Sequence, residues 1–413
     1  MSRTARVFAL LVVFSLGAFA ALPITGGAAK PPPGRGYNTT SSTSSTTTTS
    51  SSSTATTSTS TTSSTTTTTT SSGTSLGADL PPALPPSLGP AFYVSPTGSD
   101  TAAGTLLAPW RTLQRALNAV LPGQTVYVRA GTYPEWATLS RSGTAVAPIT
   151  LRAYPGEQPV LTGRLKLTGS YARVSGFLFQ GGTASNATGV LVYVSGGDDL
   201  ELSANEIRGA AMSGVYVGDP GNRADHLFIV GNFIHDNGTH TNLDHGIYFG
   251  YGSAGLIANN LIVHNFAQGI KLAPDAQATI ATANTVVGNG RSGILVGGDT
   301  VDLSNNNMVV NNIAAYNSDW GIRSYWDAGV GVGNQVDRDL VYGNGSGAFW
   351  FPGGGISATE AILASPQFTS LSTGDYDLLA GSPAVDTALP DYSPTTDYTG
   401  PRGPPPDLGA LER

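Results

Sequence analysis

The stretch LDHGIYFGYG, residues 243–252, contains a pattern that recurs through the C-terminal half of the chain. Its Gly-Ile-Tyr centre has close variants at 213–217 (SGVYV), 268–272 (QGIKL), 292–296 (SGILV) and 320–324 (WGIRS). An apolar residue follows the glycine in each variant, whereas the next residue changes among Tyr, Lys, Leu and Arg. Because side chains alternate between the two faces of a strand, the pattern predicts a buried apolar face and a variable outer face.

Two columns of asparagines and one of glycines accompany this pattern, and the asparagines recur every 24 to 28 residues. The runs between them are short and rich in Val, Ile and Thr, which predicts strands rather than helices. A repeat of this length with several short strands predicts an all-β parallel solenoid, in which each turn contacts its neighbours. The columns are Asn205, Asn232, Asn260, Asn284, Asn312 and Asp339; Asn237, Asn265, Asn289, Asn317 and Asn344; and Gly214, Gly246, Gly269, Gly293, Gly321 and Gly347. We expect the asparagine amides to stack and to bond one another and the backbone.

The N-terminal part of the chain does not have the composition of a folded domain. Residues 1–29 contain arginines followed by an apolar run and small residues, which predicts a secretory signal peptide, with an uncleaved membrane anchor as the alternative. Residues 30–90 are dominated by Ser, Thr and Pro, a composition that predicts a disordered linker. We therefore expect an extracellular protein, displayed on the cell wall or surface through this stalk.

The folded part is expected to be a β-helix over 91–355, closed by a C-terminal cap over 356–413. Residues 109–121 predict an amphipathic capping helix, with Pro109 at its first position and Leu113, Ala116, Leu117 and Val120 on its buried face. Such a helix would protect the open N-terminal end of the solenoid.

Composition excludes several classes of site and partner. The chain has no cysteine, which excludes disulfides, thiolate metal ligands and cysteine nucleophiles. Its net charge of −7, with only 11% charged residues, gives no indication of nucleic-acid binding. We expect a monomer.

The chain resembles the secreted right-handed parallel β-helix proteins of the pectate-lyase-like superfamily. Residues 91–135, beginning AFYVSPTGSD, look like the opening of those proteins, and PITLRAYPGEQPVLTG at 148–163 continues the likeness. The Asn and Gly columns resemble the superfamily repeat, and DYDLLAGSPAVDTA at 375–388 with PDLGALE at 406–412 is similar to its closing segment. The resemblance implies a right-handed parallel β-helix, and it leaves the activity open because this fold hosts many activities.

The outer face of the repeated strand is where we expect the functional site. Its predicted residues, one from each coil, are Tyr216, Tyr248, Lys271, Leu295, Arg323 and Phe349. Lys271 is one of only two lysines after residue 90, and all five histidines fall within 39 residues around the coil of Tyr248. A cation beside a tyrosine suits β-elimination from a uronic acid, which needs a base, an acid and a neutralised carboxylate.

Lyases of the superfamily commonly use a Lys or Arg base together with Ca²⁺. The resemblance therefore implies Lys271 as the base, its pKa lowered by a neighbouring positive charge. Arg323 or Arg291 would hold the substrate carboxylate, and Tyr248 or His245 would be the acid, although strict alternation points His245 inward. Tyr216, Arg291, Trp320 and Asp244 are the candidate substrate-binding residues. Asp219 and Asp244, with Asp225 and Asp236 nearby, are the candidate ligands for Ca²⁺, but they show no compact spacing.

Three other interpretations stay open at this point. A non-catalytic, glycan-binding adhesin would also suit the Ser/Thr stalk and the outward aromatic residues. A glycoside hydrolase is suggested by GDD at 197–199, yet Asp198 and Asp199 do not fall on the outer face with a partner carboxylate. A uronan epimerase is the third alternative, and in each case the expected partner is a polysaccharide. Ordinary solvated surface residues would explain the Tyr, Lys and Arg equally well.

Overall fold

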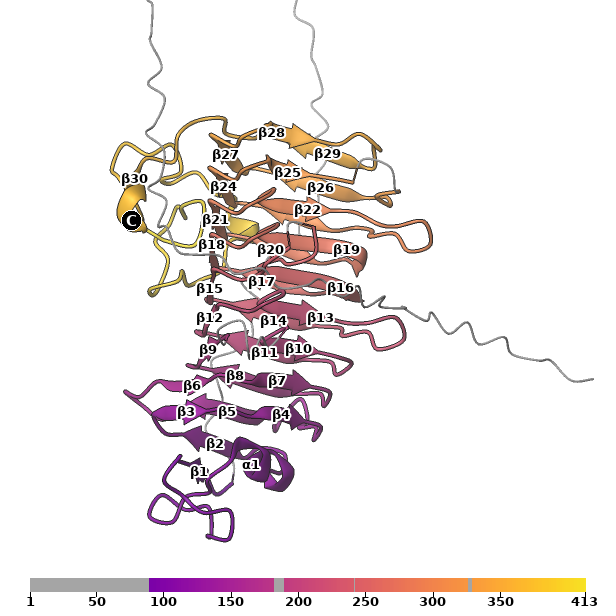
Figure 1. Cartoon of the computed structure of the whole chain (residues 1–413). Helices are drawn as coiled ribbons and strands as arrows, with labels where there is room; N and C mark the ends of the chain where they lie inside the picture. The colour runs from indigo at the N-terminus through magenta and orange to yellow at the C-terminus, as the bar shows by residue number, and fades with distance from the viewer. Residues whose placement is uncertain (1–88, 182–188, 241, 326–328) are drawn as a thin grey trace, which may run out of the picture. The chain divides into compact units, whose positions relative to one another are not determined.

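The computed structural model describes residues 89–181, 189–240, 242–325 and 329–413. These residues form a solenoid of stacked coils whose strands build three parallel sheets, called here sheets A, B and C (Figure 1). Between residues 125 and 350 each coil contributes one short strand to each sheet, and each of these strands pairs with its counterparts in the neighbouring coils. The right-handed parallel β-helix predicted from the repeats is confirmed. The predicted signal peptide and nearly all of the predicted linker lie outside the described residues.

The strands are short, as the repeat predicts. Sheet A contains β1 (Phe92–Val94), β2 (Thr125–Val128), β5 (Ile149–Ala153), β8 (Ala172–Ser175), β11 (Leu200–Ser203), β14 (Leu227–Val230), β17 (Leu256–Ala258), β20 (Ile280–Thr282), β23 (Met308–Val310), β26 (Asn334–Asp337) and β29 (Ile356–Thr359). Sheet B contains β3 (Gly131–Tyr133), β6 (Pro159–Leu161), β9 (Leu178–Gln180), β12 (Glu206–Arg208), β15 (Phe233–His235), β18 (Leu261–Val263), β21 (Thr285–Val287), β24 (Ile313–Ala315) and β27 (Leu340–Tyr342). Sheet C contains β4 (Trp136–Leu139), β7 (Arg164–Leu167), β10 (Val192–Val194), β13 (Val215–Val217), β16 (Ile247–Ser253), β19 (Ile270–Gln277), β22 (Ile294–Val296), β25 (Trp320–Arg323) and β28 (Gly347–Trp350).

The inner face of sheet C is the apolar face that the sequence predicts. The register aligns Ile247 with Ile270 and Ile294, and it aligns Phe249 with Leu272 and Val296. These six side chains are buried in the core. The variable residues therefore lie on the outer face, as alternation requires.

One residue predicted to lie on the outer face of sheet C, Phe349, was placed wrongly. Arg323 pairs with Trp350, whereas Phe349 pairs with Ile322 and packs against the core. Gly347 pairs with Trp320 rather than with Gly321, so counting from the glycine misplaces the last strand by one residue.

The asparagine columns form ladders along the solenoid. In the ladder between sheets A and B, each Nδ2 donates to the Oδ1 of the next coil at 2.9–3.0 Å, from Asn205 through to Asp339. The same Nδ2 group also donates to a backbone carbonyl, for example from Asn312 to Ala281 at 2.9 Å. A second ladder runs from Asn237 to Asn344. The buried backbone groups at these corners are thereby satisfied, which confirms the structural interpretation of the columns.

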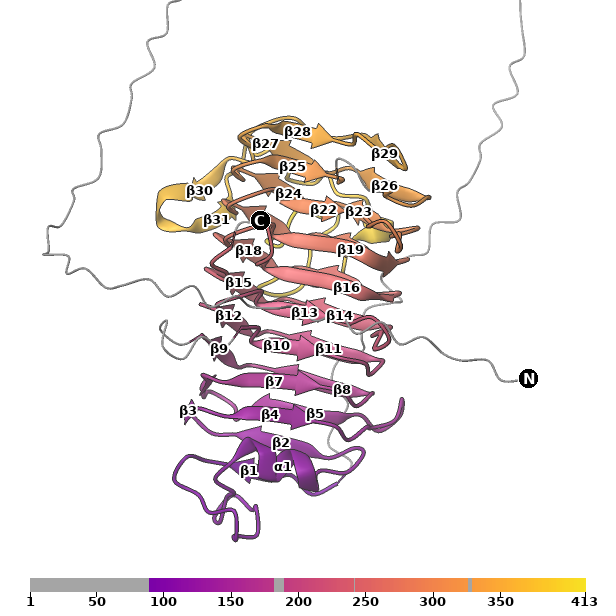
Figure 2. The ribbon, with the colours of Figure 1, turned by 45° about the vertical axis from the view of Figure 1, so that its right-hand side comes forward.

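The N-terminal capping helix is present but shorter than predicted. Helix α1 is Leu113–Ala119, and Thr112 caps it by accepting from the backbone N–H of Arg115 at 3.2 Å. Pro109 therefore lies outside the helix, because the threonine hydroxyl starts the helix three residues later. Helix α1 lies at the end of the stack (Figure 2), and its residues Leu113, Ala116 and Leu117 are buried in the core.

The C-terminal segment lies against a side of the solenoid. Strand β29 still belongs to sheet A, and the segment then forms β30 (Phe368–Ser370), the short helix η3 (Leu371–Thr373), β31 (Asp375–Leu378) and the short helix η4 (Pro390–Tyr392). Apolar residues of this segment pack on the outer face of sheet B, against side chains of β18, β21, β24 and β27. The predicted cap is thus a lateral cover, because the outer face of these strands carries apolar side chains, such as Leu261, Ile313 and Leu340, that need burial.

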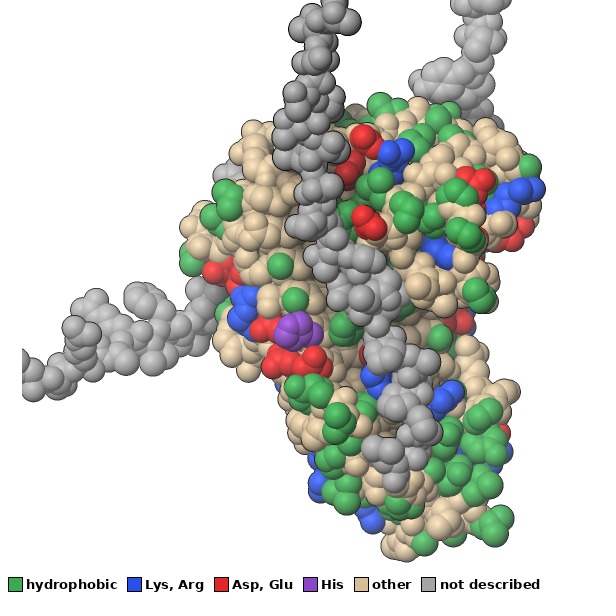
Figure 3. Space-filling model, turned by 180° about the vertical axis from the view of Figure 1, so that it is seen from behind, with side chains coloured by type: hydrophobic (Ala, Val, Ile, Leu, Met, Phe, Trp, Pro, Cys, Tyr) green, Lys and Arg blue, Asp and Glu red, His purple; other side chains and the backbone are tan. Residues whose placement is uncertain are grey.

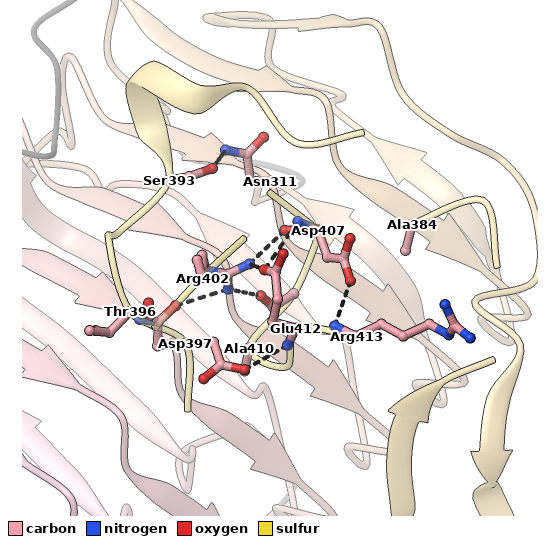
Figure 4. Close-up of polar contacts among 12 residues, drawn as sticks. Asn311, Ala384, Ser393, Thr396, Asp397, Arg402, Asp407, Ala410, Glu412 and Arg413 are labelled. Atoms are coloured by element: carbon pink, nitrogen blue, oxygen red, sulfur yellow. Dashed lines mark hydrogen bonds and ion pairs between the residues drawn. The ribbon is translucent and has the colours of Figure 1, made fainter. Parts of the chain in front are cut away.

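A buried arginine holds the end of this cover in place. Arg402 donates to Glu412 at 2.9 Å and to the Asp407 carbonyl oxygen at 2.8 Å (Figure 4). It also donates to Asn259 of the solenoid at 3.1 Å. Higher up the stack, Asn311 donates to Ser393 at 3.2 Å. The last residues of the chain are therefore tied to coils that lie far away in sequence.

None of the helices within the described ranges is long and apolar enough to cross a membrane.

Candidate functional site

The outer face of sheet C carries one line of aromatic and cationic side chains along the solenoid axis. The strand register aligns, in order, Lys166, Tyr193, Tyr216, Tyr248, Lys271, Leu295, Arg323 and Trp350. We call this set the outer line, and its strands lie one above another in Figure 2. The adjacency of Tyr216, Tyr248 and Lys271 predicted from the sequence is confirmed.

Lys271 lies in the middle of this line and is largely buried. Its side chain is only 7% exposed, and its Nζ lies 4.4 Å from the centre of the Tyr248 ring and 5.3 Å from that of Tyr325. No carboxylate among the described residues forms an ion pair with it. Burial lowers the pKa of Lys271 from 10.5 to about 8. The predicted direction is therefore right, but the cause is loss of solvent rather than the neighbouring positive charge we expected.

Tyr248 packs its ring against this lysine and keeps its hydroxyl protonated. Its ring meets that of Tyr216 edge-on, with 4.8 Å between the centres. Burial, and then the neighbouring Tyr216 and Tyr325, raise the pKa of Tyr248 well above its ordinary range. The hydroxyl thus keeps its proton at the mildly alkaline pH at which Lys271 becomes neutral, so the pair can act as base and acid together.

His245 lies behind the site and has no access to solvent. Its Nδ1 accepts from the backbone N–H of Gln268 at 3.3 Å, and its ring meets Tyr248 edge-on at 5.2 Å. Burial, and then the charge of Lys271, hold the pKa of His245 well below its usual value. His245 is therefore buried against the outer-face residue Tyr248, and without access to solvent it cannot reach a substrate as the acid.

Arg323 belongs to the outer line but does not face solvent. It is 2% exposed, donates to Asp319 at 2.7 Å and lies 5.0 Å from the centre of the Trp350 ring. Arg291 contacts the same carboxylate at 3.5 Å and also donates to Asn242, while its side chain stays 27% exposed. The expectation that Arg323 could hold a substrate carboxylate is not supported, because Asp319 already occupies its guanidinium. Arg291 is the more accessible of the two cations.

Trp320 and Asp244 also have partners within the protein. The Trp320 ring stacks on Trp350 at 5.9 Å, so it packs against the end of the outer line. Asp244 is 1% exposed and accepts from the backbone N–H groups of Thr239 and His240 at 2.8 and 2.7 Å. Asp244 therefore stabilises the turn before β16 and is not exposed beside the outer line.

The predicted Ca²⁺ ligands do not come together. Asp219 accepts from the Tyr193 hydroxyl and from Ser195, whereas Asp244 is held in its own turn on another coil. Within the described part of the chain, no group of three or more His, Asp or Glu residues is arranged to hold a metal ion. These residues do not provide the six to eight oxygens that Ca²⁺ requires.

A cavity of about 470 Å³ adjoins the site where β16 and β19 run on beyond their neighbours. It is lined by Pro220, Gly221, Arg223, Tyr251, Asp275 and Asp302. Arg223 pairs with Asp275, and the Tyr251 hydroxyl donates to Asp302 at 3.3 Å. The charges in this cavity are largely compensated within the protein.

Sequence reasoning missed three residues of the site: Asp319, Tyr325 and Tyr193. Tyr193 could have been found, because VLVYV at 190–194 has the alternation of the other repeats. It was missed because Leu191 stands where those repeats have a glycine. Asp319 and Tyr325 flank β25, and no periodic signal indicates which way their side chains turn.

Comparison with known proteins identifies close likenesses. A family profile described as "Pel9A-like, right handed beta helix region" matches residues 92–350. The pectate lyase PEL9 of Emericella nidulans is 48% identical over 73 residues, covering 17% of this chain and 18% of that protein. Pectate lyase L of Paenibacillus polymyxa is 27% identical over 266 residues, covering 61% of this chain and 49% of that protein. The matched regions span less than half of these curated relatives.

Among solved structures, that of pectate lyase Pel9A aligns with a TM-score of 0.58 at 17% identity. The alignment covers 78% of this chain and 96% of that one. At this identity the likeness shows the fold alone.

Proposed function

The chain belongs to the family with the Pel9A-like, right-handed β-helix region, and on that premise we propose that it cleaves a uronic acid polysaccharide of the pectate type by β-elimination. The observation that carries this proposal is the buried Lys271 beside Tyr248, with a pKa of about 8. A lysine with this pKa is partly neutral at mildly alkaline pH and can then accept a proton.

In the proposed reaction, neutral Lys271 removes the proton from the carbon next to the uronate carboxylate. The electron pair forms a carbon–carbon double bond as the bond between the neighbouring carbon and the glycosidic oxygen breaks. The Tyr248 hydroxyl donates its proton to that departing oxygen, and one chain becomes two, one with an unsaturated end. Lys271 and Tyr248 lie close enough together to act on adjacent carbons of one sugar.

The developing negative charge on the carboxylate needs a positive partner. Arg291 is the candidate within the site, because its side chain is partly exposed and it emerges from the coil next to that of Lys271. Its interaction with Asp319 is 3.5 Å long, so a substrate carboxylate could compete for the guanidinium. The absence of a fitting set of Ca²⁺ ligands among the described residues leaves this task to Arg291 in our proposal.

The test is ultraviolet absorbance of the unsaturated product, measured on polygalacturonate with wild-type protein and with Lys271→Ala. We expect the wild type to form product and Lys271→Ala to be slower by about 10²–10⁴-fold, the usual cost of losing a general base. Parallel assays with Ca²⁺ and with a chelator measure any contribution of a cation. Binding of glycan without product by the wild type would favour the adhesin, and undiminished activity of Lys271→Ala would exclude this base.

We further propose that the protein is secreted, with 1–29 as the signal peptide and 30–90 as a spacer. The family likeness and the Ser/Thr-rich composition support this proposal. The mass of the protein recovered from the culture medium would show whether the first residues have been removed.

A further inference from the structure

Charge is divided unevenly along the solenoid. Residues 91–197 contain eight Lys and Arg against three Asp and Glu, whereas residues 198–413 contain eight against twenty-three. On the face shown in Figure 3, acidic side chains gather over the middle and upper coils, and the lower, N-terminal coils show mainly basic ones. Although the net charge of the chain is negative, residues 91–197 are therefore basic.

Part of this positive charge lies at the N-terminal end of the outer line. The Arg164 guanidinium lies 4.5 Å from the centre of the Trp136 ring, and the Nζ of Lys166 lies 5.0 Å from that of Tyr193. Arg164 donates to the Val190 carbonyl oxygen at 3.0 Å, and neither cation forms an ion pair with a carboxylate of the described residues. The Trp136 side chain is 64% exposed, although tryptophan is usually highly buried.

These residues are continuous with the proposed catalytic pair. Lys166 and Lys271, the only two lysines after residue 90, lie on one register, with Tyr193, Tyr216 and Tyr248 between them. Four strand spacings separate them, which corresponds to ~19 Å at ~4.8 Å for each spacing. Three tyrosine rings, each edge-on to the next, thus connect two cationic positions on one face.

We propose that Trp136, Arg164, Lys166 and Tyr193 form a distal subsite that binds uronate residues of the same glycan chain, several sugars away from Lys271. This inference rests on the proposed function, because it takes the substrate to be an acidic polysaccharide. The exposed indole stacks on the apolar face of a sugar ring. The guanidinium and the ammonium pair with carboxylates of neighbouring sugars.

The features of this face select an anionic polymer over a neutral sugar or a protein. Two uncompensated cations at fixed positions would gain little from a neutral glycan, whereas repeated carboxylates offer each cation a partner. A row of three tyrosine rings, one from each successive coil, fits an extended chain lying along the solenoid axis. The subsite therefore adds affinity for long chains by linking two binding events on one molecule.

The experiment separates this subsite from the catalytic centre by chain length. Lys166→Gln and Arg164→Gln are compared with Arg152→Gln, which removes the same charge from β5 on sheet A, another side of the solenoid. With full-length protein, we expect the first two variants to raise KM for polygalacturonate about tenfold. The KM for trigalacturonate, which cannot span from Lys271 to Lys166, should change less than threefold, as should both values for Arg152→Gln.

A binding measurement distinguishes failure of the inference from failure of the proposed function. Each substitution is repeated in Lys271→Ala protein, and the affinity for polygalacturonate is measured by gel retardation at low and high salt. Weaker binding of the Lys166 and Arg164 variants at low salt supports the subsite, even if the wild type cleaves nothing. Binding equal to that of the Arg152→Gln control, or an equal loss on trigalacturonate and polymer, would overturn it while leaving the eliminase proposal intact. Thermal unfolding of each variant confirms that it is folded.

Discussion

The Nζ of Lys271 lies 4.4 Å from the centre of the Tyr248 ring, on the outer face of adjacent strands of sheet C. An aromatic face favours the charged lysine, whereas burial favours the neutral one. Burial has the larger effect, because the pKa of Lys271 falls to about 8. A group with this pKa changes its charge within the range in which an enzyme can work.

The first prediction concerns the pH dependence of cleavage. Because the base must be neutral, log kcat/KM should rise by one for each pH unit below about 8 and level off above it. The raised pKa of Tyr248 keeps the acid protonated across this rise, so the decrease on the alkaline side should come only at much higher pH. Rates on polygalacturonate between pH 6 and 10 provide the measurement, and a profile without a rising limb near pH 8 would contradict the assignment.

Lys271→Met should make the protein more stable at neutral pH. The pKa of Lys271 is about 8 in the folded protein and 10.5 as its ordinary value, so the unfolded chain binds more protons between these limits. Burial of the charged lysine therefore lowers the free energy of unfolding by the full amount, at most ~3 kcal/mol, below pH 8. This destabilisation disappears as the pH rises toward 10.5. Thermal unfolding at pH 6, 8 and 10 should show a gain for Lys271→Met that shrinks with pH. A variant less stable than wild type at pH 6 would show that contacts to the tyrosine rings outweigh the burial of charge.

Tyr248→Phe should distinguish the role of the Tyr248 hydroxyl from that of its ring. The ring contacts to Tyr216 and Lys271 are retained, whereas the proton for the departing oxygen is lost. We expect kcat to fall by about 10²–10⁴-fold with little change in Tm. Tyr216→Phe is the matched control, since it removes a hydroxyl one coil away, and its kcat should stay within a few-fold of wild type. Equal effects of the two substitutions would mean that Tyr248 is not the acid.

Asp339→Asn should stabilise the protein in a pH-dependent way. Asp339 ends an asparagine ladder, its Oδ2 has no hydrogen-bond partner among the described residues, and burial raises its pKa from 3.8 to about 8. The unfolded chain therefore releases a proton that the folded chain keeps between pH 3.8 and 8, and stability falls as the pH rises through this window. An asparagine accepts the same bonds without a charge, so the gain in Tm should be larger at pH 8 than at pH 4. Asp377→Asn, at an exposed position of β31, is the control and should change little at either pH.

Much of the fold could be predicted because, in a solenoid, residues one repeat apart in sequence become neighbours in space. The neighbours of Tyr248 in the outer line could therefore be identified by counting, and the asparagine ladders likewise. Counting fails where the period changes, as it does before β28, where Gly347 pairs with Trp320 and Trp350 takes the place expected for Phe349.

The environment of the site residues could not be predicted in the same way. Alternation indicates that Arg323 points outward from its strand, but not that Asp319 covers it, because the path of the flanking turn has no period. The burial of Lys271 likewise depends on Tyr325, beyond the end of the next-but-one strand of sheet C. Directions within a strand are local properties, whereas exposure and charge pairing depend on how the turns fold over it.

The outer line has a consequence for how such proteins could change their preferred substrate length. Each of its residues comes from a different coil, so the interval between Lys166 and Lys271 is a whole number of strand spacings. Loss or duplication of one coil between them would shorten or lengthen that interval by ~4.8 Å while every residue kept its own surroundings. Recombination between repeats could therefore change the distance between the two binding positions in discrete steps, leaving the chemistry at Lys271 unchanged.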